Sequence, residues 1–345
     1  MKKFIIDLSS ASTGGGYYIG KNLINAIKDI PNNTNQYIII VNENLLSEGT
    51  NLILFKKVSN NFYLSKIKVF YYLYLRHPCH YLINPSDIIW PFRYNQTFYF
   101  DWSLLFESKL KQLKFKRKIK WIFMRLSIYS PRKILVQTDI LKQQFKTCFN
   151  KCNVNILPLP VNENEISSAL SHKGVKSKKI IFLYPAVFSE YKNHAFLFDI
   201  AKKLWDVSPE CIFYLTIDDQ SYVSMVDKYK VKNVENIGFI SRSKILQEMA
   251  NADFLFFPSK SESYCLPILE AFALRIPVIS IAAPYTENFG GGRTIILLDP
   301  FDIDYSVDLI LSAIDSDNSL RINQAFERLN DLPSWQSFTE TILDN

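Results

Sequence analysis

Two glutamates stand eight residues apart around the start of a predicted helix. Glu262 lies in the polar loop after an apolar run at 254–257, and Glu270 lies inside the helix that begins near Leu266. Ligands in open α/β sheets bind beyond the carboxyl ends of strands and beside helix N-termini. A helix N-terminus there favours a diphosphate, and a carboxylate one or two turns further in can accept hydrogen bonds from a ribose diol. The pair therefore predicts a nucleotide site; the alternative is that Glu270 lies on a solvated helix face.

A strand–loop–helix–strand unit must position these two carboxylates. The run at 254–257 is typical of a buried strand, and Pro258 closes it because proline cannot donate to a sheet ladder. Pro267 suits the first turn of a helix, and the apolar run at 276–281 predicts the next strand. Units of this kind build parallel sheets.

The stretch 253–292 resembles the donor-site segment of retaining glycosyltransferases of family 4, which have the GT-B fold. The resemblance rests on the pattern PSxxExxxLPxLEAxxxxxPVI, which starts at Pro258. It implies that Glu262 contacts the transferred sugar near the reacting carbon and that Glu270 holds the ribose. The backbone of three following residues would face the donor: Tyr264, Cys265 and Leu266. The family usually has glycine where this chain has Cys265, and this side chain can change which sugar fits.

The same resemblance assigns roles outside that stretch. Lys192 matches the lysine of a basic pair that grips the donor diphosphate. The arginine expected five residues earlier is Val187 here, and Arg293 or Arg275 is a candidate to replace it.

A reaction-side carboxylate is expected at the end of another predicted strand. Asp101 matches the aspartate of the family's His-Asp pair, and Phe100 stands in the histidine position. The resemblance makes Asp101 a catalytic candidate alongside Glu262. The alternative is an aspartate that only starts a turn at the strand end.

A glycine loop follows the first predicted strand. Gly14, Gly15 and Gly16 lie between an apolar run at 4–8 and a helical pattern at 17–30. Such a loop lets backbone amides approach a phosphate or sugar closely. The spacing GxGxxG is absent, so a dinucleotide fingerprint is not supported. In the family a glycine-rich loop at this place faces the donor, which makes Gly15 and Gly16 donor-binding candidates.

Length and strand pattern indicate two α/β domains. The chain has 345 residues, which is long for one core. Further strands are predicted at 37–41, 52–55, 87–91, 96–101 and 133–138. The resemblance implies a GT-B fold, in which two Rossmann-like domains face each other across a deep cleft. We expect an acceptor-binding domain at 1–165, a nucleotide-sugar-binding domain at 175–328, and a helix at 329–345 that returns toward the first domain.

The charge pattern indicates which partners the protein could bind, and the cysteine spacing indicates whether it could bind zinc. The formal net charge is +7, and basic residues alternate with apolar ones at 102–133 and 66–76. This composition is typical of a helix on anionic lipid, and the alternative is a solvated basic face over a core helix. No nucleic-acid motif accompanies the charge, so nucleic acid is not an expected partner. The scattered cysteines lack zinc spacing, and we expect buried reduced thiols.

The expected function is transfer of a sugar, with retained anomeric configuration, from a UDP- or GDP-sugar to an acceptor hydroxyl. The acceptor would be a lipid-linked glycan or oligosaccharide in bacterial surface polysaccharide synthesis, such as O-antigen or capsule. The family needs no divalent metal, and no cofactor is expected beyond the donor. No run approaches a membrane span, so we expect a cytoplasmic protein, peripheral on the inner face of the plasma membrane. The alternatives are a non-catalytic nucleotide-sugar-binding subunit and a GT-B nucleotide-sugar epimerase.

Overall fold

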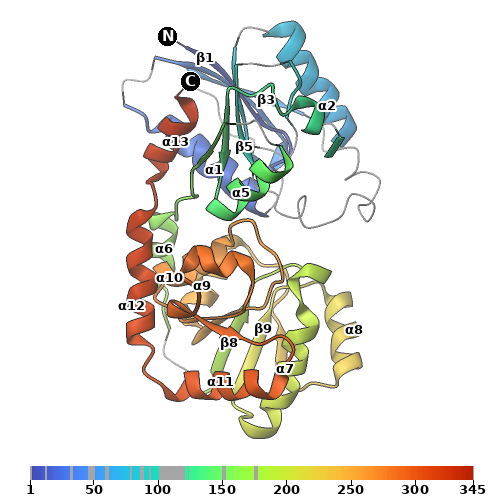
Figure 1. Ribbon diagram of the computed structural model, residues 1–345, viewed down its shortest axis with the longest axis vertical. Coiled ribbons are helices and arrows are strands. Elements are labelled where there is room, and N and C mark those ends of the chain that lie inside the picture. Colours follow the sequence, from blue (N-terminus) through green and yellow to red (C-terminus); the bar gives the residue numbers. More distant parts are fainter. Residues whose placement is uncertain are drawn as a thin grey trace. The chain divides into compact units, whose positions relative to one another are not determined.

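Two parallel β-sheets organise the chain (Figure 1). The structure is a computed structural model that describes residues 2–11, 14–31, 34–45, 51–58, 62–77, 80–85, 89–92, 95–100, 121–122, 124–149, 153–174 and 178–344. The chain divides into unit 1, residues 1–160 with 333–345, and unit 2, residues 161–332. The ranges predicted from the sequence were 1–165, 175–328 and 329–345. In the structure the boundary between the units lies between Pro160 and Val161, before the helix that opens unit 2.

Unit 1 holds a seven-stranded sheet in the order β3-β2-β1-β4-β5-β6-β7. Its inner strands are rich in isoleucine and valine and are buried on both faces, as parallel strands covered by helices require. The strands are β1 (Lys3–Leu8), β2 (Gln36–Val41), β3 (Ile53–Lys57), β4 (Tyr81–Asn84), β5 (Gln96–Phe100), β6 (Lys133–Val136) and β7 (Val154–Ile156). The helices include α1 (Gly14–Lys28), α2 (Phe62–Phe70), which continues as the π-helix η2 (Tyr71–Arg76), and α5 (Asp139–Cys148).

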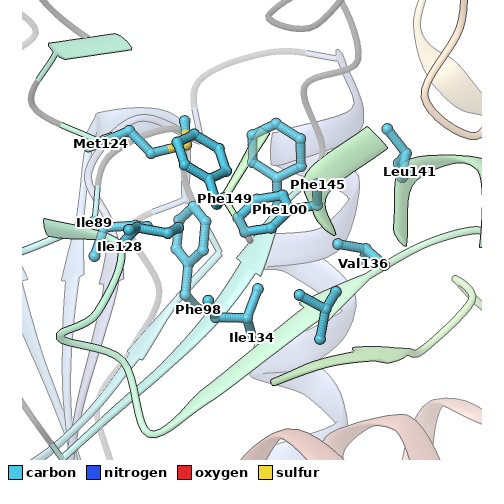
Figure 2. Close-up of a cluster of buried hydrophobic side chains, with 11 residues drawn as sticks. Ile89, Phe98, Phe100, Met124, Ile128, Ile134, Val136, Leu141, Phe145 and Phe149 are labelled. Atoms are coloured by element: carbon cyan, nitrogen blue, oxygen red, sulfur yellow. The ribbon is translucent and has the colours of Figure 1, made fainter. Parts of the chain in front are cut away.

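An aromatic core fixes one side of this sheet (Figure 2). Phe98 and Phe100 of β5 are both fully buried, and Phe100 meets Phe145 of α5 edge-on at 5.4 Å between ring centroids. Phe145 in turn packs on Phe149 at 5.1 Å. The edge-to-face pair of Phe100 and Phe145 adds to the burial of apolar area and holds α5 against the strand.

Helix α13 (Trp335–Leu343) completes unit 1 although it follows unit 2 in the chain. Its Trp335 ring lies 5.5 Å from Tyr18 of α1, and its fully buried Phe338 lies 5.4 Å from Tyr99 of β5. Lys133 of β6 donates to the carbonyl of Thr341 at 2.9 Å. The helix is therefore part of the unit 1 core.

Unit 2 holds a six-stranded parallel sheet in the order β10-β9-β8-β11-β12-β13. The strands are β8 (Ile180–Tyr184), β9 (Cys211–Leu215), β10 (Val234–Asn236), β11 (Phe254–Phe257), β12 (Val278–Ile281) and β13 (Ile295–Leu298). Numbered within the unit, the order is 3-2-1-4-5-6, the doubly wound Rossmann arrangement. The strand order reverses between β8 and β11, so the expected ligand site lies beyond the carboxyl ends of these two strands.

Helices pack in two groups around this sheet. One group contains α7 (His194–Val207), α8 (Asp219–Tyr229) and α11 (Ile303–Asp315); the other contains α6 (Glu163–Leu170), α9 (Arg242–Asn251), α10 (Leu266–Ala273) and α12 (Ser319–Glu327). The short helices η4 (Glu190–Lys192), η5 (Pro284–Phe289), η6 (Gly291–Arg293) and η7 (Arg328–Asp331) connect the larger elements. Phe182 of β8 stacks on Phe213 at 4.8 Å and on Phe254 at 5.2 Å, which ties the three central strands together.

Three sequence-based expectations differ from the structure. Gly14, Gly15 and Gly16 form the first turn of α1 and not a loop, since only Gly14 has a positive φ, 60°. The strand predicted at 87–91 is wrong for its described residues, because Ile89, Trp90 and Pro91 lie in a turn region. The strand that precedes β5 is instead β4 (Tyr81–Asn84), which was not predicted from the sequence.

Two further expectations can be compared directly. Cys211 and Cys265 are buried free thiols as predicted, but Cys148 is exposed because it lies in the last turn of α5. Among the described residues, no helix is long and apolar enough to span a bilayer.

Candidate functional site

The loops after β8 and β11 are joined by an ion pair. Lys192 lies in η4 beyond β8, and Glu262 lies in the loop beyond β11. Lys192 Nζ donates to Glu262 Oε1 at 2.5 Å, and the two side chains are only 12% and 13% exposed. The pair thus sits at the point where the strand order reverses, the place that the sheet topology assigns to a ligand.

A network of hydrogen bonds fixes Lys192. Its carbonyl accepts from the hydroxyl of Tyr184, the last residue of β8, at 2.5 Å. The Tyr191 carbonyl accepts from the Lys260 backbone at 2.8 Å and from the Ser259 hydroxyl at 3.2 Å. The two loops are therefore bound to each other by backbone as well as by charge, which positions the Lys192 ammonium before any ligand arrives.

Electrostatics keep Lys192 charged. Burial by itself lowers the pKa of Lys192, but the charge and hydrogen bond of Glu262 outweigh it, so the pKa lies above its usual value. The ammonium also lies 5.1 Å from the ring centroids of Tyr191 and of Phe257. A lysine held in this way is a permanent point cation beside the helix α10, and can neutralise a phosphate.

Helix α10 begins at Leu266 directly after the site loop. Its N-cap residue Cys265 has φ 50° and ψ 68°, a left-handed conformation that normally favours glycine. Pro267 occupies the first turn, where its missing N–H has no partner to lose. Tyr264 and Cys265 are each 5% exposed, so the side chain that replaces the family's glycine is buried next to Glu262. Burial, with the Glu262 charge, raises the pKa of the Cys265 thiol well above its usual value, so this thiol stays protonated.

Glu270 lies one turn into α10 and is 3% exposed. A solvated helix face is therefore the wrong interpretation of this residue. Its carboxylate is paired with the guanidinium of Arg242, at the start of α9, and Arg242 Nε also donates to Glu165 Oε2 of α6 at 2.9 Å. Burial raises the pKa of Glu270, while the Arg242 charge and hydrogen bond act in the opposite direction. Sequence reasoning missed Arg242 and Glu165, because neither lies in the site segment.

The structure brings the predicted donor residues of unit 2 together. Lys192, Glu262 and the stretch 264–270 all follow the carboxyl ends of strands β8 and β11 of the unit 2 sheet. Gly15 and Gly16 belong to α1 in unit 1, where a Cβ added at Gly15 would meet nothing within 4 Å. Asp101 lies outside the described residues.

The two proposed substitutes for the missing arginine lie at the amino ends of the strands, opposite to Lys192 and Glu262. Arg275 precedes β12, donates to Asn323 at 3.0 Å, and stacks on Phe326 at 4.0 Å from its ring centroid. Arg293 immediately precedes β13. Because all strands are parallel, both arginines stand at amino ends, whereas Lys192 and Glu262 follow carboxyl ends. Neither completes a clamp with Lys192.

A second polar cluster lies at the carboxyl ends of the strands of the unit 1 sheet. The Asp7 carboxylate, at the end of β1, accepts from Trp90 Nε1 at 3.0 Å and lies 3.8 Å from Lys66 Nζ. Lys66, from α2, also donates to the hydroxyls of Ser9 and Ser10, each at 2.9 Å. The strand order of unit 1 reverses between β1 and β4, so this cluster stands at the position that corresponds to the site in unit 2.

Comparison with protein-family models finds a match within unit 2. Residues 168–325 match the family model described as glycosyl transferases group 1. Residues 168–325 belong to the group 1 glycosyltransferase family. This group 1 region contains the whole unit 2 site, from Lys192 to Glu270. A comparison with curated proteins found no match.

Solved structures of glycosyltransferases share the architecture of the entire chain. Sucrose-phosphate synthase from Thermosynechococcus elongatus is similar over 99% of this chain and 97% of its own, with a TM-score of 0.78 and 13% identity. WaaG, a glycosyltransferase of lipopolysaccharide biosynthesis, is similar over 100% of both chains (TM-score 0.76, 13% identity). Anabaena HepE, solved with UDP and glucose, is similar over 99% and 98% (TM-score 0.73, 12% identity). The predicted α/β GT-B fold of the chain is confirmed.

Proposed function

We propose that this protein is a retaining glycosyltransferase that moves a sugar from a nucleoside-diphosphate sugar to an acceptor hydroxyl. The observation that carries the proposal is the partly buried Lys192–Glu262 pair at the carboxyl ends of β8 and β11, with the buried Glu270 inside the adjacent helix. The cation and the helix N-terminus suit a diphosphate, and the two carboxylates suit a sugar and a ribose.

The proposed chemistry is mainly electrostatic. As the bond between the sugar and the diphosphate breaks, negative charge grows on the leaving phosphate, and Lys192 with the first amides of α10 would stabilise it. Glu262 would hold the sugar hydroxyls near the reacting carbon. Asp101 stays a catalytic candidate on the acceptor side. The bond to the acceptor oxygen forms on the face from which the diphosphate leaves, and the acceptor proton passes to the departing phosphate oxygen.

The donor in this proposal is a UDP- or GDP-sugar. HepE, one of the similar structures, was solved with UDP and glucose. We propose that unit 2 binds the nucleotide sugar and that unit 1 binds the acceptor. The polar cluster of Asp7, Ser9 and Lys66 supports a role for unit 1 because it offers carboxylate, hydroxyl and ammonium groups at the switch point of that sheet. No divalent metal is part of the proposal.

A nucleotide screen tests this function. Isothermal titration with UDP-, GDP-, TDP- and ADP-sugars should show binding of one nucleotide class to the wild type. Glu270→Ala should weaken that binding by roughly 10- to 100-fold, the effect of losing charged hydrogen bonds to the ribose. The donor found in this way then enters a transfer assay with lipid-linked acceptors, where NMR of the product reads the anomeric configuration. Failure of every nucleotide sugar to bind would rule out the proposed donor site.

The acceptor is proposed to be lipid-linked, at an anionic membrane surface. Along α2 and η2, the most exposed of the large apolar side chains that the structure describes are Leu64 (54%), Ile67 (65%) and Leu75 (69%). Lys68 and Arg76 are exposed on the same helical segment. Apolar side chains that can enter the headgroup region, beside cations that attract anionic lipid, favour such a surface. The similarity to WaaG, a lipopolysaccharide enzyme, agrees with a glycolipid acceptor.

Vesicle binding tests this surface. Ile67→Glu with Leu75→Glu should reduce cosedimentation with vesicles containing about 30% phosphatidylglycerol by roughly tenfold, because two charges replace the inserting side chains. The matched control is Val223→Glu with Leu320→Glu, which changes two exposed apolar residues of unit 2. Equal binding by the two double variants would contradict the membrane proposal, and so would binding of the wild type to neutral vesicles at the same level.

A further inference from the structure

Three helices of unit 2 meet through one arginine. Arg242 of α9 binds Glu165 of α6 at 2.9 Å through Nε, and its terminal nitrogen binds the Glu270 carboxylate of α10. The arginine side chain is 29% exposed, while the Glu165 and Glu270 side chains are 19% and 4% exposed. The guanidinium thus forms a bridge between a partly exposed carboxylate and a buried one.

The position of Arg242 in its helix is locally unfavourable. It is the first residue of α9, after the N-cap Ser241, and no acidic residue lies in that first turn. A cation at this end opposes the helix dipole. Such a placement needs compensation from outside the helix, and both carboxylates that supply it come from other helices. Residues that break a local rule in this way are typical of functional sites.

Arg242 also stands on the side of the sheet that carries the site. It follows β10, and therefore the carboxyl ends of the parallel strands, whereas Arg275 and Arg293 precede strands. Arg321 donates to the carbonyls of Gly292 and Ile295, at the amino end of β13. Arg328 donates to the carbonyl of Asn288 at 3.1 Å.

The charge of Arg242 is directed at Glu270 and not at a phosphate. Its guanidinium already faces two carboxylates, so it carries little excess positive charge for a diphosphate. Glu270 in contrast needs it: an isolated carboxylate with 3% exposure would be strongly penalised by the loss of water. Bound by Arg242 at Oε1, the Glu270 carboxylate keeps further lone pairs for ribose hydroxyls.

We infer that Arg242 is a positioning residue of the donor site: anchored on Glu165, it holds the Glu270 carboxylate in the orientation that accepts hydrogen bonds from the nucleotide ribose. This inference rests on the proposed function and adds two residues to its site. Arg242 acts through Glu270 and sets how strongly the protein distinguishes a ribose diol from a sugar without it.

The test compares nucleotides with and without the diol. UDP and GDP are titrated into wild type and variants, each as the ribonucleotide and as the 2′,3′-dideoxynucleotide. The wild type should prefer one ribonucleotide over its dideoxy form by roughly 10- to 100-fold. Arg242→Met should reduce that preference to about threefold or less, Arg242→Lys should be intermediate, and Glu165→Gln should lose part of it. The matched control Arg293→Met, an exposed arginine outside the site, should keep the wild-type preference.

Each outcome has one meaning. A variant that is only damaged in its fold loses affinity for both forms equally, and the preference ratio is unchanged; circular dichroism and thermal unfolding check the fold in parallel. An unchanged ratio in both Arg242 variants would overturn the inference while leaving the donor site intact. If the wild type binds no nucleotide, or binds both forms equally, the proposed role of Glu270 fails, and the inference fails with it.

Discussion

Replacing Lys192 by methionine should lower kcat/KM for the donor by about 10²- to 10³-fold, the usual effect of removing one preorganised group that stabilises developing charge. The methionine keeps much of the apolar stem that packs on the rings of Tyr191 and Phe257 but removes the ammonium. Since the ammonium is held in place by the loops after β8 and β11 before the donor binds, its loss should fall mainly on the chemical step. Release of nucleotide from the donor identified by titration measures the effect.

Two comparisons separate catalysis from stability. Lys260→Met removes an exposed lysine from the adjacent loop and should leave turnover unchanged. Lys192→Met combined with Glu262→Gln should be far less damaging than the product of the single effects, because the two side chains act as one pair at 2.5 Å. Turnover within threefold of the wild type in Lys192→Met would refute the role of this lysine, as would strictly multiplicative effects in the double variant.

The largest expected effect of pH on stability comes from His194. Burial lowers the pKa of His194 to about 4; the Ala186 backbone opposes this, and the Lys192 charge adds to it. Its ring is 2% exposed and lies against Tyr184 and Phe188, at 4.9 and 5.1 Å between centroids. The unfolded chain takes up this proton near pH 6.5 and the folded chain only near pH 4, so stability falls as the pH drops through that window.

His194→Phe keeps the ring and removes the titration. Between about pH 7 and about pH 4.5, the variant should lose roughly 2 kcal/mol less unfolding free energy than the wild type. Urea unfolding at the two pH values measures the difference, and the other titrating carboxylates cancel in the comparison. His172→Gln, a change at an exposed histidine of the same unit, serves as the control and should keep the full acid sensitivity. An equal acid sensitivity in His194→Phe would show that the ring accepts its proton in the folded state.

The sequence predicted the parts of the fold that depend on local pattern. The unit from β11 to β12 matches the prediction because its apolar runs are short, Pro258 and Pro267 mark a strand end and a helix start, and each signal lies within a few residues of the element it defines. Lys192 was assigned to the donor site only through the family resemblance, and its ion pair with Glu262 was not predicted. Their contact spans 70 residues, and neither residue type carries a signal at that distance.

Other features depended on tertiary contacts that no local pattern reveals. Glu270 looks like a surface residue in the sequence, and its burial follows from the packing of α10 against α9 and α12. Arg242 is the first residue of a polar helix, α9, and has no apolar signal near it that points toward the site. The first turn of α1 contains three glycines, which have low intrinsic helix propensity, yet the packing of Tyr18 and Ile19 holds the turn.

The order of the chain through the two units has a consequence for biosynthesis. Unit 2 is one continuous stretch, residues 161–332, whereas unit 1 needs both residues 1–160 and α13. On the ribosome, unit 2 can therefore fold as soon as it emerges, while unit 1 must wait with Tyr18 and Tyr99 still lacking their partners Trp335 and Phe338. A nascent chain stalled before Pro333 would expose this apolar surface until α13 docks. Apolar surface that is exposed in this way during folding is what chaperones bind.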